Sequence, residues 1–145
     1  MKSNLIPLKI IALAGNKTLR GRIRLQKLVF LSQIKAKQDG LFYFEPAPFG
    51  PLSNELNDTI SQLSSLDLID EIVESTQSGN DVYCYKITNE GSLFLEIGIK
   101  AGNLPTILNS AIESVYNEFG EMPYVDLLEY VHNKYPDFKL EDFEF

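Results

Sequence analysis

Few side chains in this sequence could carry out chemistry, and their surroundings predict no active site. The single histidine, His132, is interpreted as a surface residue of a C-terminal helix rather than a general base. The single cysteine, Cys84, falls in a predicted strand, where a small buried hydrophobic role is favoured over a reactive thiol. The motifs G-x-S-x-G and H-E-x-x-H and a phosphate-cradling glycine loop are not in the sequence. We therefore predict a protein that is not an enzyme, and assign no catalytic residue.

Metal-ligating residues are equally sparse. One cysteine and one histidine do not supply the usual ligands of a zinc site. Four acids gather around the first strand of a predicted hairpin and could in principle hold a divalent cation: Asp67, Asp70, Glu71 and Glu74. A solvated acidic face is the favoured interpretation. The sequence thus predicts neither a metal site nor a cofactor.

Charge is distributed unevenly along the chain, although the net charge of the whole sequence is −7. Residues 1–40 carry nine of the thirteen basic residues and one acid, a balance of +8. The remaining residues carry a balance of −15. Such asymmetry is typical of proteins that bind a polyanion or an acidic partner. The alternative is that the basic segment packs beside the acidic remainder and the charges offset each other.

The basic residues Arg20, Arg24 and Lys27 have the spacing i, i+4, i+7, and Arg22 lies between them. On a helix this spacing places three cations on one face, which could contact several phosphates of DNA. The predicted helix at 52–66, which would take the recognition position, carries no base, and neither does the segment 74–81. We predict a partner- or nucleic-acid-binding face made of Arg20, Arg22, Arg24 and Lys27.

A second candidate surface is the segment 42–51, which combines aromatic residues with three prolines. Aromatic side chains commonly anchor protein interfaces. We predict an interface loop made of Phe42, Phe44, Phe49 and Pro51. The alternative is that these rings cap the core beneath the following helix.

The pattern of apolar and turn residues predicts an α+β fold that is mostly helical. Helices are expected at 5–14, 22–37, 52–66 and 88–99, a short strand at 41–44, and a hairpin from strands at 68–75 and 82–87. This order is that of a winged helix-turn-helix. Gly98 to Gly102 is expected to be a linker.

Beyond the linker, two amphipathic segments predict a C-terminal helical hairpin, at about 104–119 and from Pro123 to Pro136. We therefore divide the chain into a winged-helix-like domain at 1–100 and a helical extension at 103–145. The extension must bury its apolar stripes, either on the domain itself or across a homodimer.

The overall composition is that of an ordinary globular protein, with 44% hydrophobic and 23% charged residues. No apolar run approaches the roughly 18 residues that a membrane span needs, so we expect no membrane association. A single cysteine excludes an internal disulfide framework and fits the reducing cytoplasm, where we expect the protein to be located.

Two sequence boxes resemble a known family. Residues 21–31, GRIRLQKLVFL, resemble the G-R-x-R-L-Q-K-L-x-F/Y-L stretch of the Panacea (SocA-like antitoxin) superfamily, and residues 49–56, FGPLSNEL, resemble its aromatic-G-P-x-S-x-E-L box. The resemblance covers about residues 5–100, and the segment 128–136 is similar to tails of uncharacterised, often archaeal, relatives. The positions that match the two boxes are Arg22, Arg24, Gln26, Lys27, Phe49, Gly50, Pro51 and Ser53.

The resemblance implies a helical, winged-helix-like domain without catalysis. Antitoxin members of that superfamily bind a partner protein, which they neutralise or deliver to a protease. We therefore expect a regulatory or adaptor protein that acts by protein–protein recognition. The alternative function is a DNA-binding transcriptional regulator that uses the basic second helix. The same boxes could instead serve the fold, with Lys27 or Arg24 reaching carbonyls of the 45–50 loop and Ser53 capping the next helix.

Overall fold

The computed structural model describes residues 2–38 and 40–140. Six α-helices and a three-stranded antiparallel sheet make up this part of the chain, which is a mixed α+β fold dominated by helix. The helices are α1 (Leu5–Leu13), α2 (Arg22–Lys35), α3 (Asn54–Ser65), α4 (Asn89–Lys100), α5 (Thr106–Phe119) and α6 (Tyr124–Lys134). The strands are β1 (Leu19–Arg20), β2 (Ile69–Ser75) and β3 (Asp81–Ile87), and a 3-10 turn, η1, covers Pro136–Phe138.

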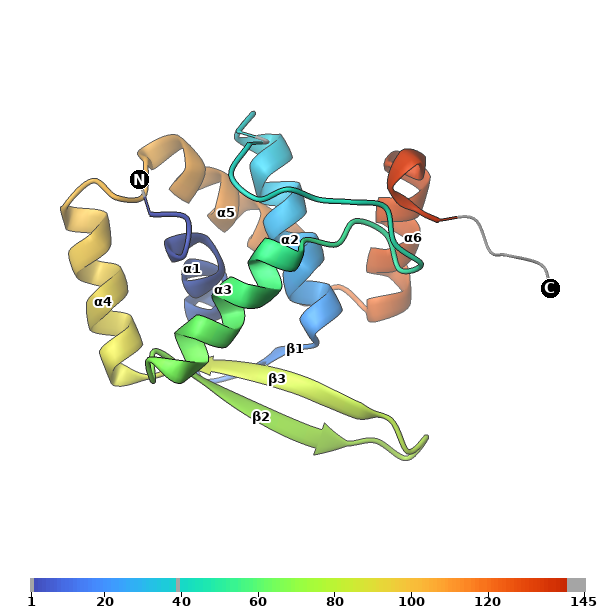
Figure 1. The fold of residues 1–145 in the computed structure, drawn as a ribbon, viewed down its shortest axis with the longest axis horizontal. Helices are drawn as coiled ribbons and strands as arrows, with labels where there is room; N and C mark the ends of the chain where they lie inside the picture. Colours follow the sequence, from blue (N-terminus) through green and yellow to red (C-terminus); the bar gives the residue numbers. More distant parts are fainter. Residues whose placement is uncertain (1, 39, 141–145) are drawn as a thin grey trace.

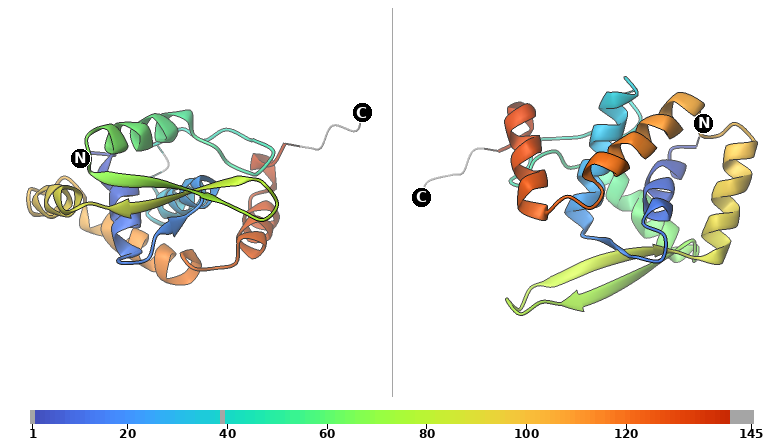
Figure 2. Two further views of the ribbon diagram at one scale, coloured as in Figure 1. Left: turned by 90° about the horizontal axis from the view of Figure 1, so that it is seen from below. Right: turned by 180° about the vertical axis from the view of Figure 1, so that it is seen from behind.

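Helices α1 and α2 form the centre of the molecule (Figure 1). Apart from Lys9, the residues of α1 are apolar on every side, which is typical of a helix surrounded by other elements. Leu5, Ile6 and Leu8 are fully buried, as are Ile10 and Ile11. Seen from below the sheet, α3 and α5 lie on opposite sides of this central pair, with α4 at one end and α6 at the other (Figure 2).

Helices α5 and α6 pack on the same chain. Their buried apolar residues belong to the hydrophobic cluster that contains the side chains of α1 and α2: Leu108, Ile112, Val115, Phe119, Leu127 and Val131. Helix α5 lies across α1 and α2 and contacts both (Figure 2). The amphipathic pattern that predicted the C-terminal hairpin is thus buried in contacts within the chain.

The sheet has the order β1-β3-β2. Strands β2 and β3 form the predicted hairpin, with Ile69 opposite Ile87 and Ser75 opposite Asp81. The far half of the hairpin projects from the body of the molecule (Figure 1). Because β1 has only two residues, the hairpin tip extends beyond the region that β1 covers.

The predicted strand at 41–44 is wrong. The third strand is instead β1, which pairs with β3 through Leu19 opposite Tyr85. Residues 41–44 form no ladder, because the rings of Phe42 and Phe44 turn into the core and the backbone of Phe42 bonds to the side chain of Gln33. Two residues of strand carry no recognisable periodicity, so β1 leaves little trace in the sequence.

The predicted linker at 98–102 is also misplaced, because α4 continues through Lys100. Gly98 is buried inside this helix, and a Cβ there would lie 2.8 Å from a methyl carbon of Leu5. The glycine therefore permits close packing of α4 on α1 rather than chain flexibility.

Candidate functional site

Three of the four predicted basic residues line one concavity, which we call the hairpin groove. It has a volume of about 680 Å³ and lies between the N-terminus of α2, the far half of the hairpin and the first residue of α6. Its lining is Arg20, Gly21, Arg22, Ile23, Arg24, Thr76, Ser78, Asn80, Asp81, Val82, Tyr83 and Tyr124. The arginine, tyrosine and hydroxyl side chains give the groove a surface that is partly polar and partly aromatic.

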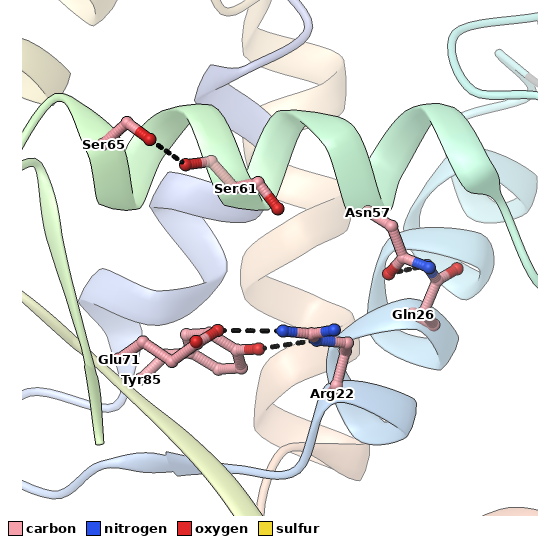
Figure 3. Close-up of polar contacts among 7 residues, drawn as sticks. All are labelled: Arg22, Gln26, Asn57, Ser61, Ser65, Glu71 and Tyr85. Atoms are coloured by element: carbon pink, nitrogen blue, oxygen red, sulfur yellow. Dashed lines mark hydrogen bonds and ion pairs between the residues drawn. The ribbon is translucent and has the colours of Figure 1, made fainter. Parts of the chain in front are cut away.

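Two side chains of the sheet, Glu71 and Tyr85, hold the Arg22 side chain (Figure 3). Its Nε donates to the Tyr85 hydroxyl at 2.9 Å, and its Nη2 donates to the Glu71 carboxylate at 3.0 Å. The guanidinium also lies over the Tyr83 ring, 4.7 Å from the ring centroid. The hydrogen bond with Tyr85, and then the contact with Glu71, raise the pKa of Arg22. Burial raises the pKa of Tyr85 to about 12, so this phenol stays neutral at physiological pH.

Arg20 has an acidic partner as well. It lies on β1, and its Nη1 forms an ion pair with Glu74 on β2, in which both side chains are about half exposed. Two of the acids that the sequence placed in a solvated cluster, Glu71 and Glu74, therefore neutralise the two accessible arginines. A phosphate that approached Arg20 or Arg22 would have to displace a carboxylate.

The four basic residues do not form one exposed stripe. The helix begins at Arg22, so Arg20 lies outside it and the spacing i, i+4, i+7 does not describe a helical face. Arg24 is 9% exposed and Lys27 is 2% exposed, because both side chains point into the body of the protein. Of the residues expected to contact phosphates, Arg20 and Arg22 are therefore accessible at the groove, whereas Arg24 and Lys27 are largely buried.

Arg24 holds the turn between α5 and α6. Its Nη1 donates to the carbonyl of Met122 at 2.6 Å and to that of Gly120 at 3.3 Å, and its Nε donates to the carbonyl of Arg20 at 3.1 Å. Burial lowers the pKa of Arg24, although a guanidinium stays protonated in proteins. A cation at the C-terminus of α5 also interacts favourably with the helix dipole.

We expect Arg24→Met to lower the free energy of unfolding by about 2–3 kcal/mol, because the variant leaves carbonyls at the α5–α6 turn without donors. Equilibrium unfolding in urea, followed by circular dichroism, measures this loss. Lys17→Met is the matched control, since its ion pair with Glu121 is largely exposed, and we expect a change below about 0.5 kcal/mol. Equal stability of Arg24→Met and the wild type would contradict this role.

Lys27 lies under the second sequence box. Its Nζ is 3.5 Å from the carbonyl of Pro51, and burial lowers its pKa to about 8. Gly50 has φ +99°, and a Cβ there would lie 3.3 Å from the Lys27 Nζ and 3.5 Å from the His132 ring. Glycine at position 50 suits this close passage over Lys27, since a side chain would be strained at this φ and would press on the Lys27 amine. His132 is partly buried at this contact, rather than on the open surface as predicted.

Two glutamines of α2 clamp the two ends of the loop 42–53. The Gln26 amide donates to the carbonyl of Ser53 and accepts from its N–H, both at 2.9 Å. The Gln33 amide does the same for the backbone of Phe42, at 3.2 and 2.9 Å. Ser53 in turn caps α3 by accepting from the Leu56 N–H. The two sequence boxes, residues 21–31 and 49–56, are therefore hydrogen-bonded to each other.

The four residues of the predicted interface loop differ in exposure, because the clamp holds most of them against the body of the protein. Phe42 is 3% and Phe44 is 9% exposed, and the Phe44 ring packs edge-on against Phe30 at 5.2 Å. Pro51 is buried, whereas Phe49 is 55% exposed. Of the four predicted residues, Phe49 alone presents a large side chain to a partner.

Sequence reasoning missed the aromatic residues of the hairpin groove, Tyr83 and Tyr124. Each falls in a regular alternation or helical pattern, so local sequence does not distinguish a ring in a groove from a ring in the core. The only available signal was the position of Tyr83 in a strand whose neighbour, β2, carries mostly polar residues.

The remaining candidate groups are the cysteine thiol and the possible metal ligands. Cys84 is fully buried, and burial raises the pKa of its thiol, which disfavours the thiolate. Within residues 2–38 and 40–140, no three His, Cys, Asp or Glu side chains gather as metal ligands. In the same part of the chain, no helix is long and apolar enough to cross a membrane. Neither a protein-family model nor a curated protein matches this sequence.

Proposed function

We propose that this protein is a non-enzymatic regulatory or adaptor protein that acts by protein–protein recognition, in the manner of the antitoxins its two boxes resemble. The hairpin groove is the proposed contact site. One observation carries the proposal: the accessible arginines beside the groove, Arg20 and Arg22, are already paired with the protein's own Glu74 and Glu71. Their charge is therefore poorly placed for a polyanion, while the groove retains the residue types that anchor protein interfaces.

Two rings supply the anchoring surface. Tyr83 is 37% and Tyr124 is 40% exposed, and each lines the groove. A tyrosine buries a large apolar ring and offers a hydroxyl, and it loses little conformational entropy because it has only two side-chain torsions. Arg22 stacks on Tyr83 and so holds that ring in place before a partner binds. The groove is thus suited to one or two side chains of a partner protein.

The second candidate function is a winged-helix DNA-binding regulator. The element order α1-β1-α2-α3-β2-β3 and the sheet order β1-β3-β2 support a winged-helix fold, with the hairpin as the wing. Three observations support the adaptor proposal over this one. Helix α3 carries no basic residue, and the acids of the hairpin neutralise the nearby arginines. In addition, residues 36–53 separate α2 from α3, whereas a helix-turn-helix joins its two helices by a turn of about three or four residues.

The test compares two tyrosine variants. Tyr83→Ser removes a ring from the groove, and Tyr43→Ser removes a ring that is 67% exposed and outside it. The tagged proteins are used to capture partners from nuclease-treated lysate at low and high salt. We expect a protein retained at near-stoichiometric amounts by the wild type and by Tyr43→Ser, and bound at least tenfold more weakly by Tyr83→Ser. Equal retention by both variants would exclude the groove.

A direct titration with duplex DNA separates the two functions. If about five side chains contact phosphates, the logarithm of the affinity falls with the logarithm of salt concentration at a slope of about −4 to −5. We expect no such binding, because the guanidinium groups already have partners. A steep salt-dependent affinity for DNA, unaffected by Tyr83→Ser, would replace the adaptor proposal with the DNA-binding one.

A further inference from the structure

Helix α4 stands at the end of the molecule opposite the hairpin tip and α6, and packs on α1 with one side (Figures 1 and 2). Gly91, Leu95 and Gly98 form its buried side. Its opposite side is open and carries two large apolar residues, Leu93 and Ile97, each 58% exposed. Exposed aliphatic residues one helical turn apart form a small apolar stripe of the kind that another helix covers.

The charges at the two ends of this stripe have opposite sign. Glu90 lies one turn before Leu93, and Lys100 lies one turn after Ile97, and both are exposed. With 3.6 residues per turn, these four residues occupy one face of the helix. The order along that face is therefore acid, apolar, apolar, base.

If a second copy of this face runs in the opposite direction, each acid meets a base and each apolar residue meets another apolar residue. A second α4 placed antiparallel on the open side, with the two-fold axis at the level of residue 95 along the helix, puts Leu93 opposite Ile97 of the other copy and Glu90 opposite its Lys100. A two-fold interface requires such self-complementarity, since the same patch serves both partners. An antiparallel arrangement also sets the helix dipoles in opposition, which is favourable. We propose that this protein forms a homodimer through antiparallel packing of its α4 helices.

One further feature agrees with this occupant. The Glu96–Lys100 contact within α4 is an exposed i, i+4 pair, so Lys100 can exchange it for Glu90 of the other copy at little cost. Such a dimer leaves both hairpin grooves at its outer ends.

The size of the contact sets its expected strength. Helix α4 has 12 residues, and one pair of helices of this length buries less than the roughly 1,200 Å² at which stable interfaces begin. We therefore expect a weak dimer that dissociates on dilution. Sedimentation of the full chain from micromolar to near-millimolar concentration measures the dissociation constant.

Four variants test the geometry. Ile97→Glu is expected to weaken the dimer at least tenfold, whereas Val125→Glu, at an apolar residue of α6 that is 65% exposed, is expected to leave it unchanged. Glu90→Lys alone sets like charges opposite each other and weakens the dimer. The double variant Glu90→Lys with Lys100→Glu restores opposite charges between the copies and recovers association.

Circular dichroism and the melting temperature confirm that each variant is folded. Any of three results would overturn the proposal: a wild type that stays monomeric at every concentration, an Ile97→Glu dimer as strong as the wild type, or a double charge variant no better than Glu90→Lys. The partner-capture experiment does not depend on these results, because the hairpin groove and α4 share no residue.

Discussion

Replacing Gln26 with leucine is expected to lower the free energy of unfolding by about 2–5 kcal/mol, since it leaves two buried backbone groups without partners. Those groups are the N–H and the carbonyl of Ser53, each 2.9 Å from the Gln26 amide. Leucine has a similar volume but neither a donor nor an acceptor. The loss therefore measures hydrogen bonding more than packing.

Ser53 makes this position sensitive. Its hydroxyl caps α3 by accepting from the Leu56 N–H, so a displaced backbone at Ser53 also disturbs the start of the helix. Equilibrium unfolding in urea, with circular dichroism as the signal, gives the change in stability. If the slope of the unfolding free energy against urea concentration is unchanged, the variant and the wild type expose the same amount of surface on unfolding.

Asn57→Ala is the matched control for Gln26→Leu. The Asn57 side chain is the third partner of the Gln26 amide, and its Oδ1 accepts a hydrogen bond from the Gln26 Nε2 at 2.9 Å (Figure 3). Its removal leaves both bonds to Ser53 intact, so we expect a loss below about 1 kcal/mol. A Gln26→Leu protein as stable as Asn57→Ala would show that the two boxes do not depend on this clamp.

The second large effect is a pH dependence that comes from Lys27. Its pKa is about 8 in the folded protein, against an ordinary value of 10.5. Between these two values the unfolded chain binds more protons than the folded protein, so the free energy of unfolding rises with pH in this window. Below pH 8 the amine is protonated in both states, and it adds no slope.

Lys27→Met removes this dependence while it keeps a side chain of similar length. From pH 8 to 10.5 we expect the wild type to gain about 3 kcal/mol of stability relative to the variant. Near pH 7 the variant is expected to be the more stable protein, because it buries no charge. Urea unfolding of both proteins at several pH values provides the comparison.

Comparing the two proteins is necessary because buried tyrosines act in the opposite direction. Burial raises the pKa of Tyr85 to about 12 and also raises the pKa of Tyr116, Tyr124 and Tyr135. Above about pH 10 the unfolded chain loses these protons first, which lowers stability. This contribution is common to both proteins and cancels. Parallel stability curves for wild type and Lys27→Met would mean that Lys27 has an ordinary pKa.

Local pattern was sufficient for most of the helices and for the hairpin. The spacing of apolar residues predicted α3, α5 and α6, and the caps Ser53 and Thr88 marked the starts of α3 and α4, where each hydroxyl accepts a backbone N–H. The turn residues at 76–81 separated β2 from β3. These signals are reliable because they act between residues within about four positions of each other on a helix, or across one tight turn.

The candidate site depended on contacts that no local pattern contains. The spacing of Arg24 and Lys27 predicted a basic face, yet the two side chains donate to the backbone carbonyls of Met122 and Pro51, which are distant in sequence. Arg20 and Arg22 read as open cations until folding placed Glu74 and Glu71 beside them. The sequence carries the charge of each side chain, but whether that charge is exposed, paired or buried is a property of its neighbours in space.

The two sequence boxes, residues 21–31 and 49–56, show the same division between sequence and tertiary structure. Sequence alone established that the two boxes are present and that Ser53 could cap a helix. Only the tertiary structure decided that Gln26 of the first box would bind the backbone of Ser53 in the second. The physical reason is that a hydrogen bond between residues 27 positions apart forms only when the intervening chain has folded back, and that return is driven by burial of the core around α1 and α2.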